Sequence, residues 1–200
     1  MGLLLRYSKY AITVTIGLLI MVGSVRAAEF QADMVQRSQG MEMKGKIYVK
    51  AKKSRVDMNM MGQQTQTISR LDKQTVWVVH PGQGFYMEMP VNPGSPELIG
   101  DDQALKKYAS KKKVGSETVN GHKCDKYVIT FHDQSLGRMT TWISKKLEFP
   151  VKVIQQGPYG ESTVEYKNIQ TGKVQDSLFE LPPGLQKMTM PNMGGMAPRP

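Results

Sequence analysis

The sequence has 200 residues and is strongly basic, with 27 Lys and Arg against 17 Asp and Glu and a formal net charge of +10. Cys124 is the single cysteine, so an intramolecular disulfide is excluded and the fold must rest on packing and hydrogen bonds. The sequence contains no Gly-rich phosphate loop, nucleophile elbow or HExxH motif. We therefore expect a protein that binds rather than catalyses, with no catalytic residue and no cofactor.

Residues 1–27 have the form of a secretory signal peptide. Arg6 and Lys9 precede an apolar run over residues 11–22, and Ala27 ends a small-residue motif after which we expect cleavage. The run is well short of the roughly 20 residues that cross a bilayer as a helix, although an uncleaved N-terminal anchor is the alternative. No cysteine directly follows the run, which excludes a lipoprotein anchor. The sequence thus predicts a periplasmic protein whose remaining chain forms one domain.

The first half of that domain alternates apolar and polar residues with period two. Turn residues separate the alternating runs, and this pattern is typical of antiparallel strands. Six strands are predicted, at residues 30–34, 41–51, 56–60, 64–71, 75–80 and 85–89. They form a meander.

The segment from Pro90 to Ser110 interrupts this rhythm. Ser95 resembles a helix N-cap before a proline at the first helical position, and Asp102 could cap a second helix over residues 105–109, so one or two short helices are expected. Strands resume at 114–119 and 122–132, joined across Asn120-Gly121, a strong hairpin signal. Further strands are predicted at 139–143, 151–155 and 162–169.

About eleven sequential strands in one domain must curl, because a long twisted sheet closes on itself or folds over a covering element. The fold class predicted is therefore mainly β: a curved, partly open antiparallel β-barrel with one or two short covering helices. We assign this domain to residues 28–187, and within it we expect a short turn at Leu178-Phe179 whose Phe seals the open end of the barrel. Residues 188–200, rich in Met and Pro, are predicted to form a disordered tail.

The cations gather at Lys52-Lys53 and Lys111–Lys113. In an exported chain such runs could meet anionic lipid headgroups or lipopolysaccharide phosphates at a membrane surface, and no nucleic-acid partner is expected. The alternative is that these are solvated turns that keep the protein soluble. We expect a monomer.

Several sequence blocks resemble a known family. The blocks are Gly45–Val49, Phe85–Pro90, Gly115–Tyr127, Phe149–Lys152, Glu165–Asn168 and Leu178–Gly184. They resemble a family of small exported bacterial proteins of unknown function that looks like a member of the LolA/LolB-like superfamily of periplasmic lipoprotein carriers. The resemblance implies an incomplete antiparallel barrel with a helical lid and an apolar cavity, in which relatives carry lipids or lipoproteins. No binding residue of those carriers can be aligned with this sequence.

Methionine is the compositional outlier, with 15 residues, several of them spaced two apart. On a strand, residues two apart share a face, and methionine offers a flexible, polarizable surface. This pattern favours a cavity wall for a lipid, a lipidated partner or another hydrophobic ligand. The alternative is an ordinary core filled partly with Met. The candidate cavity residues are Met58, Met60, Trp77, Phe85, Met87, Met89, Tyr127, Ile129, Phe131 and Trp142.

A second interpretation of the methionines is a Cu(I)-binding or protein-interaction module, because thioethers and thiolates are soft ligands. His122 and Cys124 share a strand face, and the tail methionines could wrap an ion. The candidate metal ligands in this alternative are His122, Cys124, Met188, Met190, Met193 and Met196. A catalytic Cys124 is disfavoured, because His122 lies on the same strand and no third orienting residue is apparent.

Overall fold

The computed structural model describes residues 29–60, 62–91, 98–99, 101–158 and 160–188. The predicted signal peptide, residues 1–27, lies outside this described part. So do the expected helix start at Ser95 and the tail residues Met190, Met193 and Met196.

The described chain is built mainly from strands. The strands are β1 (Glu29–Ser38), β2 (Met41–Lys50), β3 (Lys53–Met60), β4 (Gln63–Arg70), β5 (Thr75–His80), β6 (Phe85–Pro90), β7 (Ala109–Val119), β8 (His122–Phe131), β9 (Arg138–Ser144), β10 (Pro150–Gly157), β11 (Gly160–Thr171) and β12 (Gln186–Lys187). The helical segments are α2 (Asp102–Leu105) and the 3-10 turns η1 (Pro81–Gln83), η2 (Gln134–Leu136) and η3 (Asp176–Phe179). The predicted mainly β class is confirmed.

All strands belong to one sheet, in the order β12-β6-β5-β4-β3-β2-β1-β11-β10-β9-β8-β7. Two runs of sequential hairpins, β1 to β6 and β7 to β11, are joined by antiparallel pairing of β1 with β11. The two-residue β12, which the sequence did not predict, adds to β6 in parallel. The sheet is curved and not closed: β7 forms one edge, and β12 forms the other.

The expected hairpin at Asn120-Gly121 is present. Both residues have positive φ, 49° and 80°, as a two-residue β-turn of this kind requires, and Val119 faces His122 across it. Strand β7 begins five residues earlier than predicted, at Ala109, because its first residues pair with the end of β8, where Ala109 faces Phe131.

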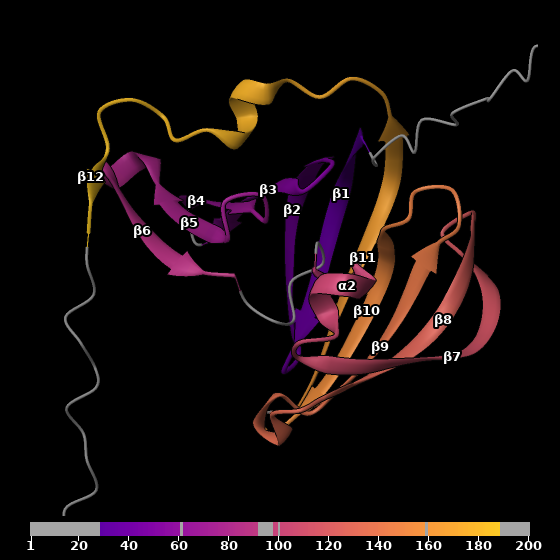
Figure 1. The fold of residues 1–200 in the computed structure, drawn as a ribbon. Coiled ribbons are helices and arrows are strands. Elements are labelled where there is room, and N and C mark those ends of the chain that lie inside the picture. The colour runs from indigo at the N-terminus through magenta and orange to yellow at the C-terminus, as the bar shows by residue number, and fades with distance from the viewer. Residues whose placement is uncertain (1–28, 61, 92–97, 100, 159, 189–200) are drawn as a thin grey trace, which may run out of the picture.

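The sheet curls around α2, which lies on its concave side (Figure 1). This helix is shorter than expected and is capped by Asp101 rather than Asp102: the Asp101 carboxylate accepts hydrogen bonds from the backbone N–H groups of Gln103 and Ala104, both at 3.1 Å. We call the side of the sheet that faces α2 the inner face. No described helix has the length and apolar character needed to span a membrane.

Buried side chains of the inner face form most of the core. Phe30, Ile47 and Val49 on β1 and β2 are fully buried, and Phe30 makes an edge-on contact with Phe149 at a centroid distance of 5.2 Å. A separate cluster of buried side chains packs around α2. It contains Leu71, Leu98, Ile99, Leu105, Ala109, Ile129, Phe131, Met139 and Val153.

The chain after β11 crosses the outer face of the sheet, the side away from α2. Phe179 in η3 is fully buried against Ile68, Trp77 and Val79, which all point outward. Leu178-Phe179 therefore covers the back of the sheet, and the expectation that it seals the open end of the barrel was wrong. Arg70, which is 4% exposed, holds this segment by donating to the Phe179 carbonyl at 3.1 Å.

Candidate functional site

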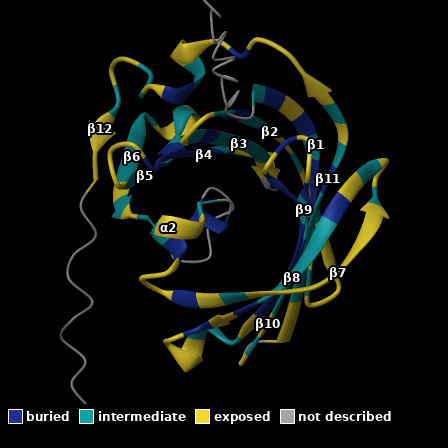
Figure 2. Ribbon diagram, turned by 45° about the vertical axis from the view of Figure 1, so that its right-hand side comes forward, coloured by how far each residue is buried: buried dark blue, intermediate teal, exposed yellow. Residues whose placement is uncertain are grey.

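The inner face carries an apolar surface on the strands β3, β5 and β6. Strand register decides which residues share it: Val76 faces Met89, Val78 faces Met87, and His80 faces Phe85. We define the apolar wall as the inner-facing, partly exposed side chains of these strands. Its members are Val56 and Met58 on β3 and Val78, Phe85, Met87 and Met89 on β5 and β6, with the inner-facing Thr65 and Thr67 of β4 between the two groups. Figure 2 shows these strands on the side of the curved sheet opposite β8 and β9, with α2 between them.

The wall differs from the core in how far its side chains are covered. Leu105 of α2 and Ile129 beneath this helix are 1% and 0% exposed, whereas Phe85 and Met87 are partly exposed. Large apolar side chains that gather on a concave surface without full burial are typical of ligand grooves. The flexible thioethers of the wall could adapt to acyl chains of different shape.

The structure places the sequence-predicted cavity residues that it describes in three surroundings: partly exposed on the inner face, buried in the core, and on the outer face. Met58, Phe85, Met87 and Met89 line the apolar wall, and Tyr127 is inner-facing and partly exposed. Met60 lies at the end of β3, but its side chain is outside the described part.

Two predicted cavity residues, Ile129 and Phe131, face inward but are packed under α2, at 0% and 3% exposure. They belong to the core, so the plain-core interpretation holds for this row. The sequence could not show whether such a row packs in the core or lines an open cavity, because both rows show the same alternation of apolar and polar residues.

Trp77 and Trp142 lie on the outer face, and this corrects their assignment to an inner cavity. Trp77 faces Ile68, and Trp142 faces Lys126 on one side and Lys152 on the other. Because side chains alternate along a strand, Trp142 points away from its inner-facing neighbour Thr141.

The outer tryptophans are held by polar partners. The Trp142 Nε1 donates to Glu117 at 2.6 Å, and the ammonium groups of Lys126 and Lys152 lie 4.8 and 5.3 Å from its ring centroid. Trp77 donates to Glu88 at 3.1 Å. These contacts give both indoles a structural role.

A charged cluster occupies the inner face at the β7–β8 end. Asp125 accepts from Ser116 at 2.6 Å and pairs with Lys113 at 2.9 Å and Lys145 at 3.2 Å. The hydrogen bond from Ser116, followed by that from Lys113, lowers the pKa of Asp125 to about 2. The inner surface is therefore amphipathic, with an apolar wall on one side and charged groups on the other.

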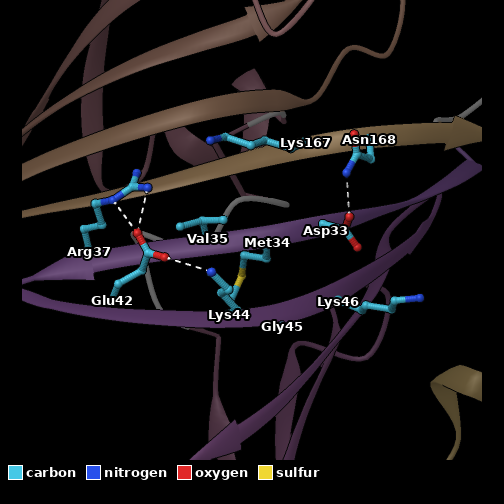
Figure 3. Close-up of a pocket in the computed structure, with 10 residues that line it drawn as sticks. All are labelled: Asp33, Met34, Val35, Arg37, Glu42, Lys44, Gly45, Lys46, Lys167 and Asn168. Carbon is cyan, nitrogen blue, oxygen red and sulfur yellow. Dashed lines mark hydrogen bonds and ion pairs between the residues drawn. The ribbon is translucent and has the colours of Figure 1, made fainter.

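A groove of about 570 Å³ crosses the sheet over β1, β2 and β11 (Figure 3). Its polar side chains compensate one another: Arg37 pairs with Glu42 at 2.8 Å, Lys44 pairs with Glu42 at 3.2 Å, and Asn168 donates to Asp33 at 2.8 Å. These pairs compensate the charge only in part, because the lining carries four cations, Arg37, Lys44, Lys46 and Lys167, against two carboxylates, Asp33 and Glu42. The groove is therefore polar and net basic, unlike the apolar wall.

The residues of the metal interpretation are only partly brought together. His122 and Cys124 lie on β8, and the Cys124 thiol donates to the His122 carbonyl at 3.2 Å. Cys124 is a buried free cysteine, and burial raises the pKa of its thiol. Among the described residues, no group of three or more His, Cys, Asp or Glu could hold a metal ion. Met188 is 49% exposed beside β6 and is remote in sequence from this pair.

Sequence comparison identifies the family. A family model described as a domain of unknown function (DUF4412) matches residues 30–148, which is more than half of the chain. The chain belongs to the DUF4412 family. The resemblance of its sequence blocks to a family of unknown function is thereby confirmed. The matched part includes the whole apolar wall and α2. A search of curated proteins found no significant match.

Solved structures share the fold of this DUF4412 protein at low sequence identity. An uncharacterized conserved protein from Thermus thermophilus is 15% identical, with a TM-score of 0.56 over 81% of this chain and 90% of that chain. MucB in the MucA/MucB complex of Pseudomonas aeruginosa is 15% identical, with a TM-score of 0.50 over 82% of this chain and 59% of that chain. The DUF4412 chain thus spans well under two thirds of that relative. A LolA superfamily protein from Nitrosomonas europaea aligns more loosely, at 10% identity and a TM-score of 0.39 over 78% of this chain and 91% of that chain.

Proposed function

We propose that this protein is a non-enzymatic binding protein of the bacterial envelope that holds a lipid, or the lipid moiety of a partner, against the inner face of its curved sheet. The observation that carries the proposal is the apolar wall: six inner-facing apolar side chains on β3, β5 and β6 that remain partly exposed beside a packed core. Partial exposure of such a concave surface costs free energy in the unbound protein, and an apolar ligand would recover it.

Two further features support this proposal. The basic, apolar N-terminal segment has the form of a signal peptide, which would direct the protein to the compartment where lipids and lipoproteins are handled. The fold also occurs in MucB, which forms a complex with MucA, so a protein that contains this fold takes part in partner binding.

Displacement of a fluorescent fatty-acid probe from the purified protein tests the proposal. We expect saturable binding that is weakened by Met87→Ser and Phe85→Ser, because a hydroxyl in the wall removes apolar contact area and adds an unpaired polar group. Met41→Ser, at a residue that is 61% exposed beside the β1–β2 turn, is the matched control and should bind as the parent does. A protein that never binds the probe, or whose wall and control variants lose binding equally, would refute the proposal.

A second candidate function is soft-metal binding. Met188 donates its backbone N–H to the Tyr86 carbonyl at 2.8 Å, which extends the β12–β6 ladder and places Met188 next to Met87 at the rim of the wall. Thioethers gathered at such a rim suit Cu(I). Anaerobic titration with Cu(I) against a competing chelator separates the two functions. Changing Met188, Met190, Met193 and Met196 to Leu should abolish metal binding while leaving fatty-acid binding intact.

A further inference from the structure

The edge strand β7 and the turn before it form an exposed basic surface. We call residues 106–114 the basic edge. Strand β7 pairs only with β8, so its other side is free within the described sheet, and most of its residues are exposed (Figure 2). Residues 103–116 contain five lysines and no acidic residue. No other part of the described sheet ends in an open edge of this length.

The charge of the basic edge is only partly neutralised. Lys111 pairs with Asp102 at 2.6 Å, and Lys113 pairs with Asp125 at 2.9 Å. Lys106, Lys107 and Lys112 are exposed and have no ion pair among the described residues. Three cations therefore remain available to an external anion along a stretch of seven residues.

Two exposed apolar side chains lie within the basic edge. Tyr108 is 39% exposed and Val114 is 49% exposed, and they are two of the four large hydrophobic residues exposed in the described chain. A tyrosine and an aliphatic side chain set among lysines are typical of proteins that lie at a membrane interface, where the rings and stems reach the headgroup level and the cations meet lipid phosphates.

Protection of a sheet edge against pairing explains only part of this composition. Lysines and a β-bulge are common on edge strands for that reason, and β7 has a register shift between Lys113 and Gly115. Lys106 and Lys107, however, precede the strand, where there is no edge to protect. Edge protection keeps a protein soluble, and an exposed Tyr108 would work against that effect.

We infer that the basic edge is a docking surface for an anionic lipid bilayer. Its uncompensated lysines match the negative charge of the bilayer, and its flanking apolar residues match the interfacial layer. The edge continues directly from α2, which lies within the curve of the sheet (Figure 1). Docking along it would therefore bring the open side of the sheet toward the membrane. The surface exists whether or not the apolar wall binds lipid.

Co-sedimentation with vesicles of phosphatidylcholine containing about 30% phosphatidylglycerol tests the inference, with pure phosphatidylcholine vesicles as reference. Each lysine near such a surface contributes roughly fivefold in affinity, so Lys106→Gln, Lys107→Gln and Lys112→Gln together should weaken binding by more than about tenfold. The control variant Lys46→Gln, Lys146→Gln and Lys173→Gln removes the same charge from exposed positions elsewhere and should change binding less than about threefold.

Tyr108→Ser tests the apolar component separately. It should reduce vesicle binding most at high salt, where the electrostatic component is screened. Equal losses in the two triple-lysine variants would show that only net charge matters, and would overturn the inference. Equal binding to vesicles with and without phosphatidylglycerol would overturn it too. Because fatty-acid displacement measures the wall directly, failure of membrane docking and failure of lipid binding are distinguishable.

Discussion

Phe131 and Met87 should respond differently to truncation, because one lies under α2 and the other lines the apolar wall. Phe131 is 3% exposed in the cluster that includes Leu105 and Met139. Phe131→Ala should therefore leave a cavity and lower the free energy of unfolding by about 3–5 kcal/mol. Met87 is partly exposed, so Met87→Ala should cost less than the roughly 2–5 kcal/mol typical of a fully buried methionine.

Urea unfolding followed by tryptophan fluorescence, with and without a saturating fatty acid, measures both effects. The fatty acid should stabilise the parent protein and Phe131→Ala by the same increment, and should stabilise Met87→Ala less. The reasoning fails if Phe131→Ala costs less than about 1.5 kcal/mol and the fatty acid restores that loss. Phe131 would then line an open cavity, and α2 would not fill this half of the inner face.

Three further predictions test other parts of the structure. Arg70→Met should lower the free energy of unfolding by about 1–3 kcal/mol, because it removes the buried donor that holds the C-terminal segment. Limited proteolysis should then cleave that segment faster than in the parent protein. Unchanged cleavage would contradict this anchoring role. The pKa of Asp125 is about 2 in the folded protein, below the unfolded value near 3.9. Its contribution to stability is therefore present above about pH 4 and is lost as the pH falls toward 2. Over that interval the urea midpoint of Asp125→Asn should decline less than that of the parent protein. Gly45→Ala would place a Cβ 2.5 Å from the backbone oxygen of Asp57 and should destabilise the folded protein by about 1–3 kcal/mol in thermal unfolding. The Cβ added by Gly115→Ala meets nothing within 4 Å, so this variant should unfold at nearly the same temperature as the parent protein.

The features predicted well from the sequence are those that depend on near neighbours in the chain. The first six strands and the Asn120-Gly121 hairpin were found because alternation and turn chemistry are local properties. The methionine pair Met87 and Met89 was placed on one face for the same reason. Val56, a wall residue that was missed, has the same parity as Met58 on β3, so the signal for it was present. Val78 was missed because it shares the inner face with Met87 only through the pairing of β5 with β6, which the sequence does not specify.

The features that were missed depend on contacts between distant segments. Pairing of β1 with β11 joins the two halves, and no local pattern specifies it. The assignments of Trp77 and Trp142 to an inner cavity failed because a hydrophobic residue in a strand can belong to either face, and here the outer face is also covered. Phe179 and Arg70 provide part of that cover, from segments more than 100 residues apart.

The stoichiometry and location of bound lipid test the central claim most directly. Protein purified from an envelope fraction should carry a lipid in native mass spectrometry, with one ligand per chain, and a photoactivatable fatty acid should crosslink to peptides that contain the wall residues Met58, Phe85 or Met87. Met87→Ser should reduce that labelling, and Met41→Ser should not. A protein that is always ligand-free, or that crosslinks instead through Lys44 and Lys46 in the groove over β1, β2 and β11, would contradict the account.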